Sequence, residues 1–145
     1  MITVKTIVST SLLQKLEALK NPKPLLRPVA FDVLALMTER IHEKGKAADG
    51  SQIGTYNNHY LKLRQRKFKR SGDGKIIVSL TRLLENDWAV LATPQGWGIG
   101  FNNPFNAQKM VWVEEQKGKK IAALTDSEKD YAVTKLKKLI DQQVN

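Results

Sequence analysis

The densest group of chemically active side chains is a basic stretch from Lys62 to Lys75, which holds seven lysines and arginines and one anion, Asp73. Cations at this density create a positive potential that attracts phosphate or carboxylate surfaces. Three aromatic residues in or beside the stretch offer base stacking, or a simple anchor for a solvated loop: Tyr56, Tyr60 and Phe68. We take six cations as candidate contacts to DNA or to an acidic partner: Lys62, Arg64, Arg66, Lys67, Lys69 and Arg70.

No set of catalytic side chains accompanies this stretch. His42 is expected near a helix end, where a structural or surface role suits it. Asn57-Asn58-His59 is only faintly similar to the histidine turn of metal-dependent nucleases, because no second ligand stands at a suitable spacing. Gly96–Gly100 lacks the lysine of a phosphate-binding loop. The sequence therefore predicts no catalytic residue, metal ligand or cofactor, and a small hydrolase or nuclease built around His59 is an alternative.

Length, charge and composition narrow the classes of protein to which these residues can belong. The chain has 145 residues, 24 Lys+Arg against 14 Asp+Glu, a net charge of +10 and 41% hydrophobic residues, which suits one globular domain. It has no cysteine, which excludes disulfides, thiolate zinc sites and cysteine catalysis. No apolar run approaches the roughly 20 residues of a membrane span, and no signal-peptide pattern opens the chain. We expect a soluble protein made and used in a cytoplasm.

Helical patterns dominate the two ends of the chain. A capping box at Ser11 and Gln14 predicts a short helix over 11–20. Apolar residues at spacings of three and four predict a long helix from Leu25 to a stop at Gly45. A second capping box predicts a terminal helix that begins after Thr125.

The middle of the chain combines a hairpin with segments whose patterns fit more than one structure. Residues 88–92 and 97–101 read as two strands around a Thr-Pro-Gln-Gly turn. The alternation of bulk and glycine in the second strand indicates a close approach by backbone or a partner. Asn103-Pro104 favours a helix over 104–117, with a strand as the alternative, and 120–124 is a possible strand. A helix over 55–68 is also possible, although like charges oppose it.

These elements predict one α+β domain over residues 1–145. A long N-terminal helix and a C-terminal helix pack on a small, mostly antiparallel sheet that contains the β-hairpin. We expect a mobile basic loop at about 46–75, which orders on docking because it buries little apolar area of its own. Three aromatic residues are candidates for an oligomer interface: Trp97, Phe101 and Trp112.

The order of these segments resembles the virion-morphogenesis or tail-completion proteins of tailed bacteriophages. The resemblance covers about residues 25–142 and rests on the Asp49-Gly50 loop, the basic middle, the Ser79–Leu83 turn and the segment that closes with Glu114–Gly118. The chain departs from the family pattern in three places. Arg82 stands where the family often has glycine, no histidine precedes Gly118, and 122–125 lacks an arginine-proline-phenylalanine sequence.

The resemblance implies assembly rather than catalysis. It implies a homo-oligomeric ring of about six or twelve copies, placed at the neck or tail of a virion as a tail terminator or head–tail connector. Neighbouring connector or tail-tube proteins would be its partners, with non-specific contact to packaged DNA and no membrane. A basic, sequence-independent nucleic-acid-binding protein is the alternative function.

Overall fold

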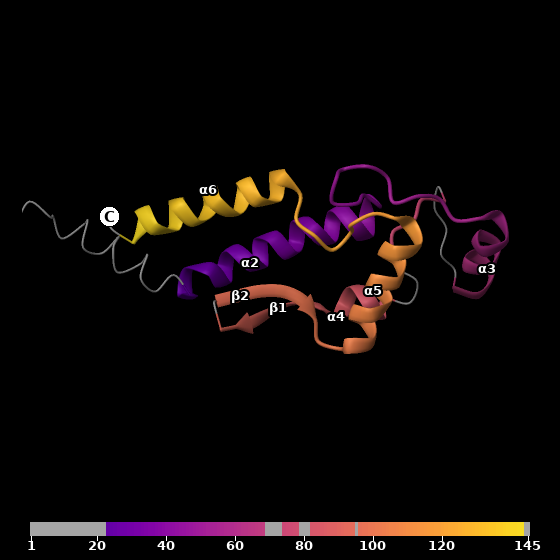
Figure 1. Cartoon of the computed structure of the whole chain (residues 1–145), viewed down its shortest axis with the longest axis horizontal. Coiled ribbons are helices and arrows are strands. Elements are labelled where there is room, and N and C mark those ends of the chain that lie inside the picture. The colour runs from indigo at the N-terminus through magenta and orange to yellow at the C-terminus, as the bar shows by residue number, and fades with distance from the viewer. Residues whose placement is uncertain (1–22, 69–73, 79–81, 95, 144–145) are drawn as a thin grey trace, which may run out of the picture.

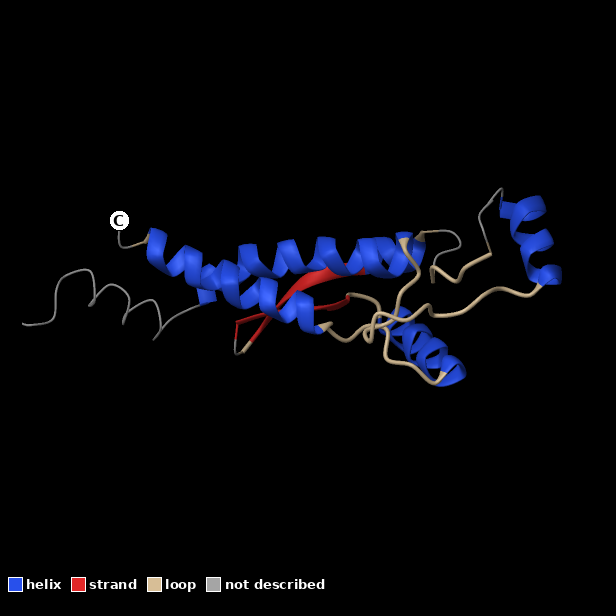
Figure 2. Ribbon diagram, turned by 90° about the horizontal axis from the view of Figure 1, so that it is seen from above, coloured by secondary structure: helices blue, strands red, loops and turns tan. Residues whose placement is uncertain are grey.

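A computed structural model describes residues 23–68, 74–78, 82–94 and 96–143. Over these ranges the chain is an α+β domain with a two-stranded antiparallel sheet, which confirms the predicted fold class. In Figure 1, helix α2 (Lys23–Thr38) is the middle layer, with α6 (Asp126–Gln142) along one side and the hairpin along the other. Helix α6 thus lies on α2, and α2 covers the sheet. Figure 2 shows α3 (Asn58–Phe68) set apart at the far end.

Helix α2 turns its apolar stripe inward, as its spacing predicts. Val29, Val33, Met37 and Ile41 are buried in the core. The helix runs into a π-helical turn, η1 (Glu39–Glu43), in which the Lys44 N–H bonds the carbonyl five residues back. This wider turn buries three consecutive residues, Arg40 to His42. Gly45 follows at φ +63°, close to the predicted helix end.

The hairpin places its bulk on one face. Strands β1 (Trp88–Thr93) and β2 (Gly96–Phe101) match the predicted hairpin. Facing pairs place bulky side chains on this face: Trp88 with Phe101, Val90 with Ile99, and Trp97 with the smaller Ala92. Trp88 is buried with α2 in the core, and Ile99 and Phe101 pack against that core. Side chains of the hairpin itself cover its glycines, because a Cβ on Gly98 or Gly100 would meet Thr93 or Leu91 at 3.3 Å.

Two short-range signals fix the remaining helices. The Asn103 side chain accepts a hydrogen bond from Phe105 N at the start of α5 (Pro104–Lys117), so 104–117 is a helix and not a strand. The capping box of Thr125 and Glu128 is formed at the start of α6. Helix α4 (Leu83–Asp87) precedes the hairpin. The predicted strand at 120–124 is wrong, since those residues form an irregular connection whose carbonyls bind Arg40.

Helix α3 lies inside the stretch expected as a basic loop, so the helical alternative for 55–68 holds over most of its length. Asn57 accepts a hydrogen bond from Tyr60 N at 2.8 Å and caps the first turn. Flanking segments pair through isolated bridges, Lys46 with Gln52 and Thr55 with Lys75. The predicted helix at 11–20 and residues 79–81 of the Ser79–Leu83 turn lie outside the described residues.

Candidate docking groove

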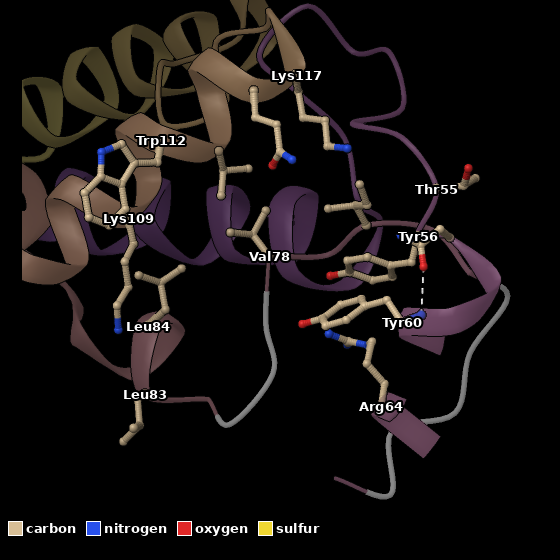
Figure 3. Close-up of a pocket in the computed structure, with 14 residues that line it drawn as sticks. Thr55, Tyr56, Tyr60, Arg64, Val78, Leu83, Leu84, Lys109, Trp112 and Lys117 are labelled. Carbon is tan, nitrogen blue, oxygen red and sulfur yellow. Dashed lines mark hydrogen bonds between the residues drawn. The ribbon is translucent and has the colours of Figure 1, made fainter. Parts of the chain in front are cut away.

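An open groove of about 880 Å³ lies between α3, α4 and α5, and we call it the docking groove. Figure 3 shows its two walls: a tyrosine–arginine stack stands on one side, and residues of α4 and α5 stand on the other. Buried aliphatic residues of the 74–78 segment contribute to its lining. The residues that line it are Thr55, Tyr56, Asn57, Tyr60, Arg64, Ile76, Val78, Leu83, Leu84, Lys109, Trp112, Val113, Gln116 and Lys117.

The first wall is a stack of one cation and two rings. The Arg64 guanidinium lies 4.4 Å from the Tyr56 ring centroid and 5.7 Å from that of Tyr60, and the two rings are 5.2 Å apart. Arg64 is buried, so this cation–π contact is partly shielded from water and stronger than an exposed one. Burial raises the pKa of the Tyr56 phenol, and the Arg64 charge opposes that rise. The stack ties α3 to the segment that precedes it.

The second wall presents apolar side chains to solvent. Trp112 on α5 is 59% exposed and Leu83 on α4 is 68% exposed. The two helices are joined at Asp87, whose carboxylate accepts hydrogen bonds from Asn103 N at 2.8 Å and Asn106 Nδ2 at 3.0 Å. These hydrogen bonds lower the pKa of Asp87. The wall is therefore held in place by polar contacts behind it, while its apolar front faces solvent.

Among the described residues that line the groove, every charged side chain is a cation. Arg64, Lys109 and Lys117 are among its lining residues, and none of the described residues that line it is an aspartate or a glutamate. A low-dielectric cleft with charges of one sign focuses the potential within it. The docking groove therefore attracts anions and offers an apolar surface at the same place.

The structure separates the predicted site residues into three groups. Arg64 and Trp112, distant in sequence, line the same groove. Lys62, Arg66 and Lys67 are exposed on α3, whereas Lys69 and Arg70 lie outside the described residues. Trp97 and Phe101 lie on the hairpin and are half-buried. The Arg27 guanidinium lies 5.4 Å from the Trp97 ring centroid, and the Phe101 and Trp88 ring centroids are 4.6 Å apart.

Leu83, Lys109 and Lys117 belong to the groove but were not among the sequence-based candidates. A signal for Lys109 was present, because Phe105, Lys109, Trp112 and Gln116 recur at helical spacing along one face of α5. Phe105 is 76% exposed and extends this face beyond the groove. Leu83 and Lys117 carry no such signal, since only the fold brings them to the groove.

The two histidines lie apart from the groove lining and differ in environment. His42 is buried, with Nδ1 3.0 Å from the Ile77 carbonyl oxygen, so Nδ1 carries the hydrogen and donates it. Burial lowers the pKa of His42. His59 is exposed on α3. Across the described part of the chain, no three histidine, aspartate or glutamate side chains gather as metal ligands would.

Comparisons with protein-family models, curated protein sequences and solved structures found no significant match. None of the helices described is both long enough and apolar enough to span a membrane.

Proposed function

We propose that this protein is a structural assembly subunit of a tailed-bacteriophage virion, of the neck, tail-completion or tail-terminator type. The observation that carries the proposal is the docking groove, in which exposed Trp112 and Leu83 adjoin Arg64, Lys109 and Lys117. Aromatic and arginine side chains are the usual anchors of protein interfaces. The resemblance of the segment order over residues 25–142 points to the same role.

In this role the subunits form a closed ring through contacts between unlike surfaces. The outer edges of the hairpin are the candidate contact between copies, by strand addition, and the docking groove is the candidate contact to a neighbouring protein. The exposed cations of α3 face packaged DNA or an acidic neighbour such as a head–tail connector or tail-tube protein. The ring assembles in the host cytoplasm and becomes part of the virion.

The test is a mass measurement by native mass spectrometry and light scattering, on the chain alone and with candidate connector or tail-tube proteins. We expect a closed ring of about six or twelve copies. A protein that stays monomeric in every mixture would contradict the proposal.

A sequence-independent nucleic-acid-binding protein is the second candidate, and one observation favours it. Helix α3 carries four cations and no acidic residue, with Lys62, Arg66 and Lys67 exposed. This function predicts that the monomer binds duplex or single-stranded DNA tightly and loses affinity steeply with salt. The assembly function predicts weak DNA binding by the monomer, so an electrophoretic mobility shift at moderate salt separates the two.

A further inference from the structure

We infer that the docking groove binds an acidic peptide segment with apolar anchors, supplied by a partner protein of different sequence. The inference rests on the proposed docking role and names the chemistry of the partner. It assigns Trp112, Leu83 and Lys109 to that contact and leaves the ring contact between copies to other surfaces.

The apolar part of the groove calls for hydrocarbon side chains. Ile76 and Val78 are buried, and together with Leu84 and Val113 they line the groove. Exposed Trp112 and Leu83 stand beside them. An aliphatic or aromatic side chain entering the groove would take both itself and these residues out of water, which is the main favourable term in protein association.

The charged part of the groove selects an acidic occupant. Lys109 and Lys117 stand beside the apolar surface, and none of the described residues that line the groove is an aspartate or a glutamate. The chain as a whole carries +10. The described charged residues of the groove are all cations, so this surface favours an acidic protein over a second copy of the same basic chain.

A nucleic acid fits these side chains less well than a peptide. Single strands bind by stacking successive bases on free aromatic faces, but the Arg64 guanidinium already lies against Tyr56 and Tyr60, so the exposed aromatic face that the groove offers is that of Trp112. The buried aliphatic lining offers no hydrogen bond to a sugar or a phosphate. A peptide with leucine or phenylalanine anchors and glutamates between them satisfies both parts of the groove.

The probe is a fluorescein-labelled synthetic peptide in which leucines recur at every third and fourth position and glutamates fill the rest. Its comparison probes are the same peptide with lysine in place of each glutamate, and an oligothymidylate. We expect the acidic peptide to bind more tightly than both, measured by fluorescence anisotropy. It should also shift the emission of Trp112 to shorter wavelength, because the exposed indole becomes buried.

Single substitutions locate the binding site. Lys109→Glu should weaken binding of the acidic peptide roughly tenfold or more, on the scale of an interface anchor. Lys137→Glu makes the same charge change at an exposed position of α6, away from the groove lining, and should have little effect. Trp112→Phe should retain most of the binding and lose the emission shift, while Trp112→Ala should lose both. Circular dichroism checks that each variant keeps its fold.

Three outcomes would overturn the inference: equal binding of the basic peptide, tighter binding of the oligothymidylate, or equal loss of affinity in Lys109→Glu and Lys137→Glu. Its failure is separable from that of the proposed function. A chain that forms rings but ignores the acidic peptide refutes the inference alone. A chain that binds the peptide through Lys109 and Trp112 but never assembles refutes the ring alone.

Discussion

At the scale of single residues, the buried Arg40–Glu128 pair connects segments that are distant in sequence, and no sequence pattern predicted this contact. Arg40 Nε lies 2.6 Å from Glu128 Oε1, and the two residues are only 8% and 4% exposed. The same guanidinium donates to three backbone carbonyls, those of Lys46, Ile121 and Ala123. Glu128 also closes the capping box of α6. One side chain thus ties η1 to the start of α6.

Arg40→Met should lower the free energy of unfolding by about 3–5 kcal/mol, because it leaves a buried carboxylate without its partner. Urea denaturation followed by circular dichroism measures this change. The double variant Arg40→Met/Glu128→Gln should recover part of the loss, since the orphaned charge is gone.

The exposed pair of Lys44 and Glu39 is the matched control. Its atoms are 2.7 Å apart, but both side chains are in water, where such pairs contribute little. Lys44→Met should leave the unfolding midpoint almost unchanged. If Arg40→Met were equally mild, the buried pair would have no special role.

His42 predicts an acid limb in the pH profile of the protein, that is, a loss of folding stability as the pH falls. Burial lowers the pKa of His42 in the folded state, against the opposing effects of the Ile77 carbonyl and Glu85. The unfolded chain therefore takes up a proton near its ordinary pKa of 6.5, while the folded chain resists until lower pH. Stability from this group is complete above pH 6.5 and is lost as the pH falls through 6.5 toward the lower folded value.

His42→Asn retains a donor for the Ile77 carbonyl and should flatten this acid limb, as measured by thermal unfolding between about pH 7 and pH 5. His59→Asn removes an exposed imidazole and should keep the limb. A limb that survives His42→Asn would assign the effect to other groups.

At the scale of elements, patterns among residues close in sequence correctly predicted the helix caps, because those caps depend on local contacts. The capping box at Thr125 and the cap at Asn103 formed as expected because each involves residues two or three positions apart. The π-turn η1 had no comparable signal, since Arg40, Ile41 and His42 are buried together by contacts with segments distant in sequence. The strand expected at 120–124 failed for the same reason: those carbonyls bind Arg40 and not a neighbouring strand.

The turn after η1 has a requirement that can be tested with a matched pair of glycines. Gly45 and Gly118 have nearly equal backbone angles, φ +63° and +62°. A Cβ at Gly45 would collide with the Ile76 carbonyl oxygen, whereas a Cβ at Gly118 would meet nothing within 4 Å. Gly118→Ala should therefore cost about 1 kcal/mol for the left-handed conformation alone.

Gly45→Ala should destabilise the protein clearly more than Gly118→Ala, because the collision with backbone adds to the same conformational cost. Denaturant unfolding of the two variants under one set of conditions makes the comparison. Equal losses would mean that the segment around Ile76 yields freely, and that the turn does not fix it against α2.

At the scale of the whole molecule, the groove could not be predicted from the sequence because it belongs to no single segment. Its residues come from α3, α4, α5 and the 74–78 segment. The sequence identified Arg64 and Trp112 as candidates separately and for different reasons. Only the fold brings them together, and the same fold half-buries Trp97 beside Arg27 and Phe101 beside Trp88.

The salt dependence of DNA binding separates the general attraction of a chain with net charge +10 from a specific contribution of α3. We expect weak duplex binding by the isolated chain, with a steep dependence on salt. Lys62, Arg66 and Lys67 are exposed on α3, so replacing all three by glutamine should flatten the slope of log affinity against log salt by up to about 2.7. Fluorescence anisotropy with labelled duplex DNA measures that slope.

The matched control removes the same charge from α6, through glutamine at three exposed lysines: Lys129, Lys137 and Lys138. If both triple variants flattened the slope equally, the attraction would belong to the net charge of the molecule, and α3 would have no special part in it. If the unmodified chain instead held duplex DNA tightly at physiological salt, and only the α3 variant released it, nucleic-acid binding would replace assembly as the function. Flattening confined to the α3 variant, with weak binding throughout, is the result that the assembly role predicts, because α3 then contributes a steering charge and the groove contributes the specific contact.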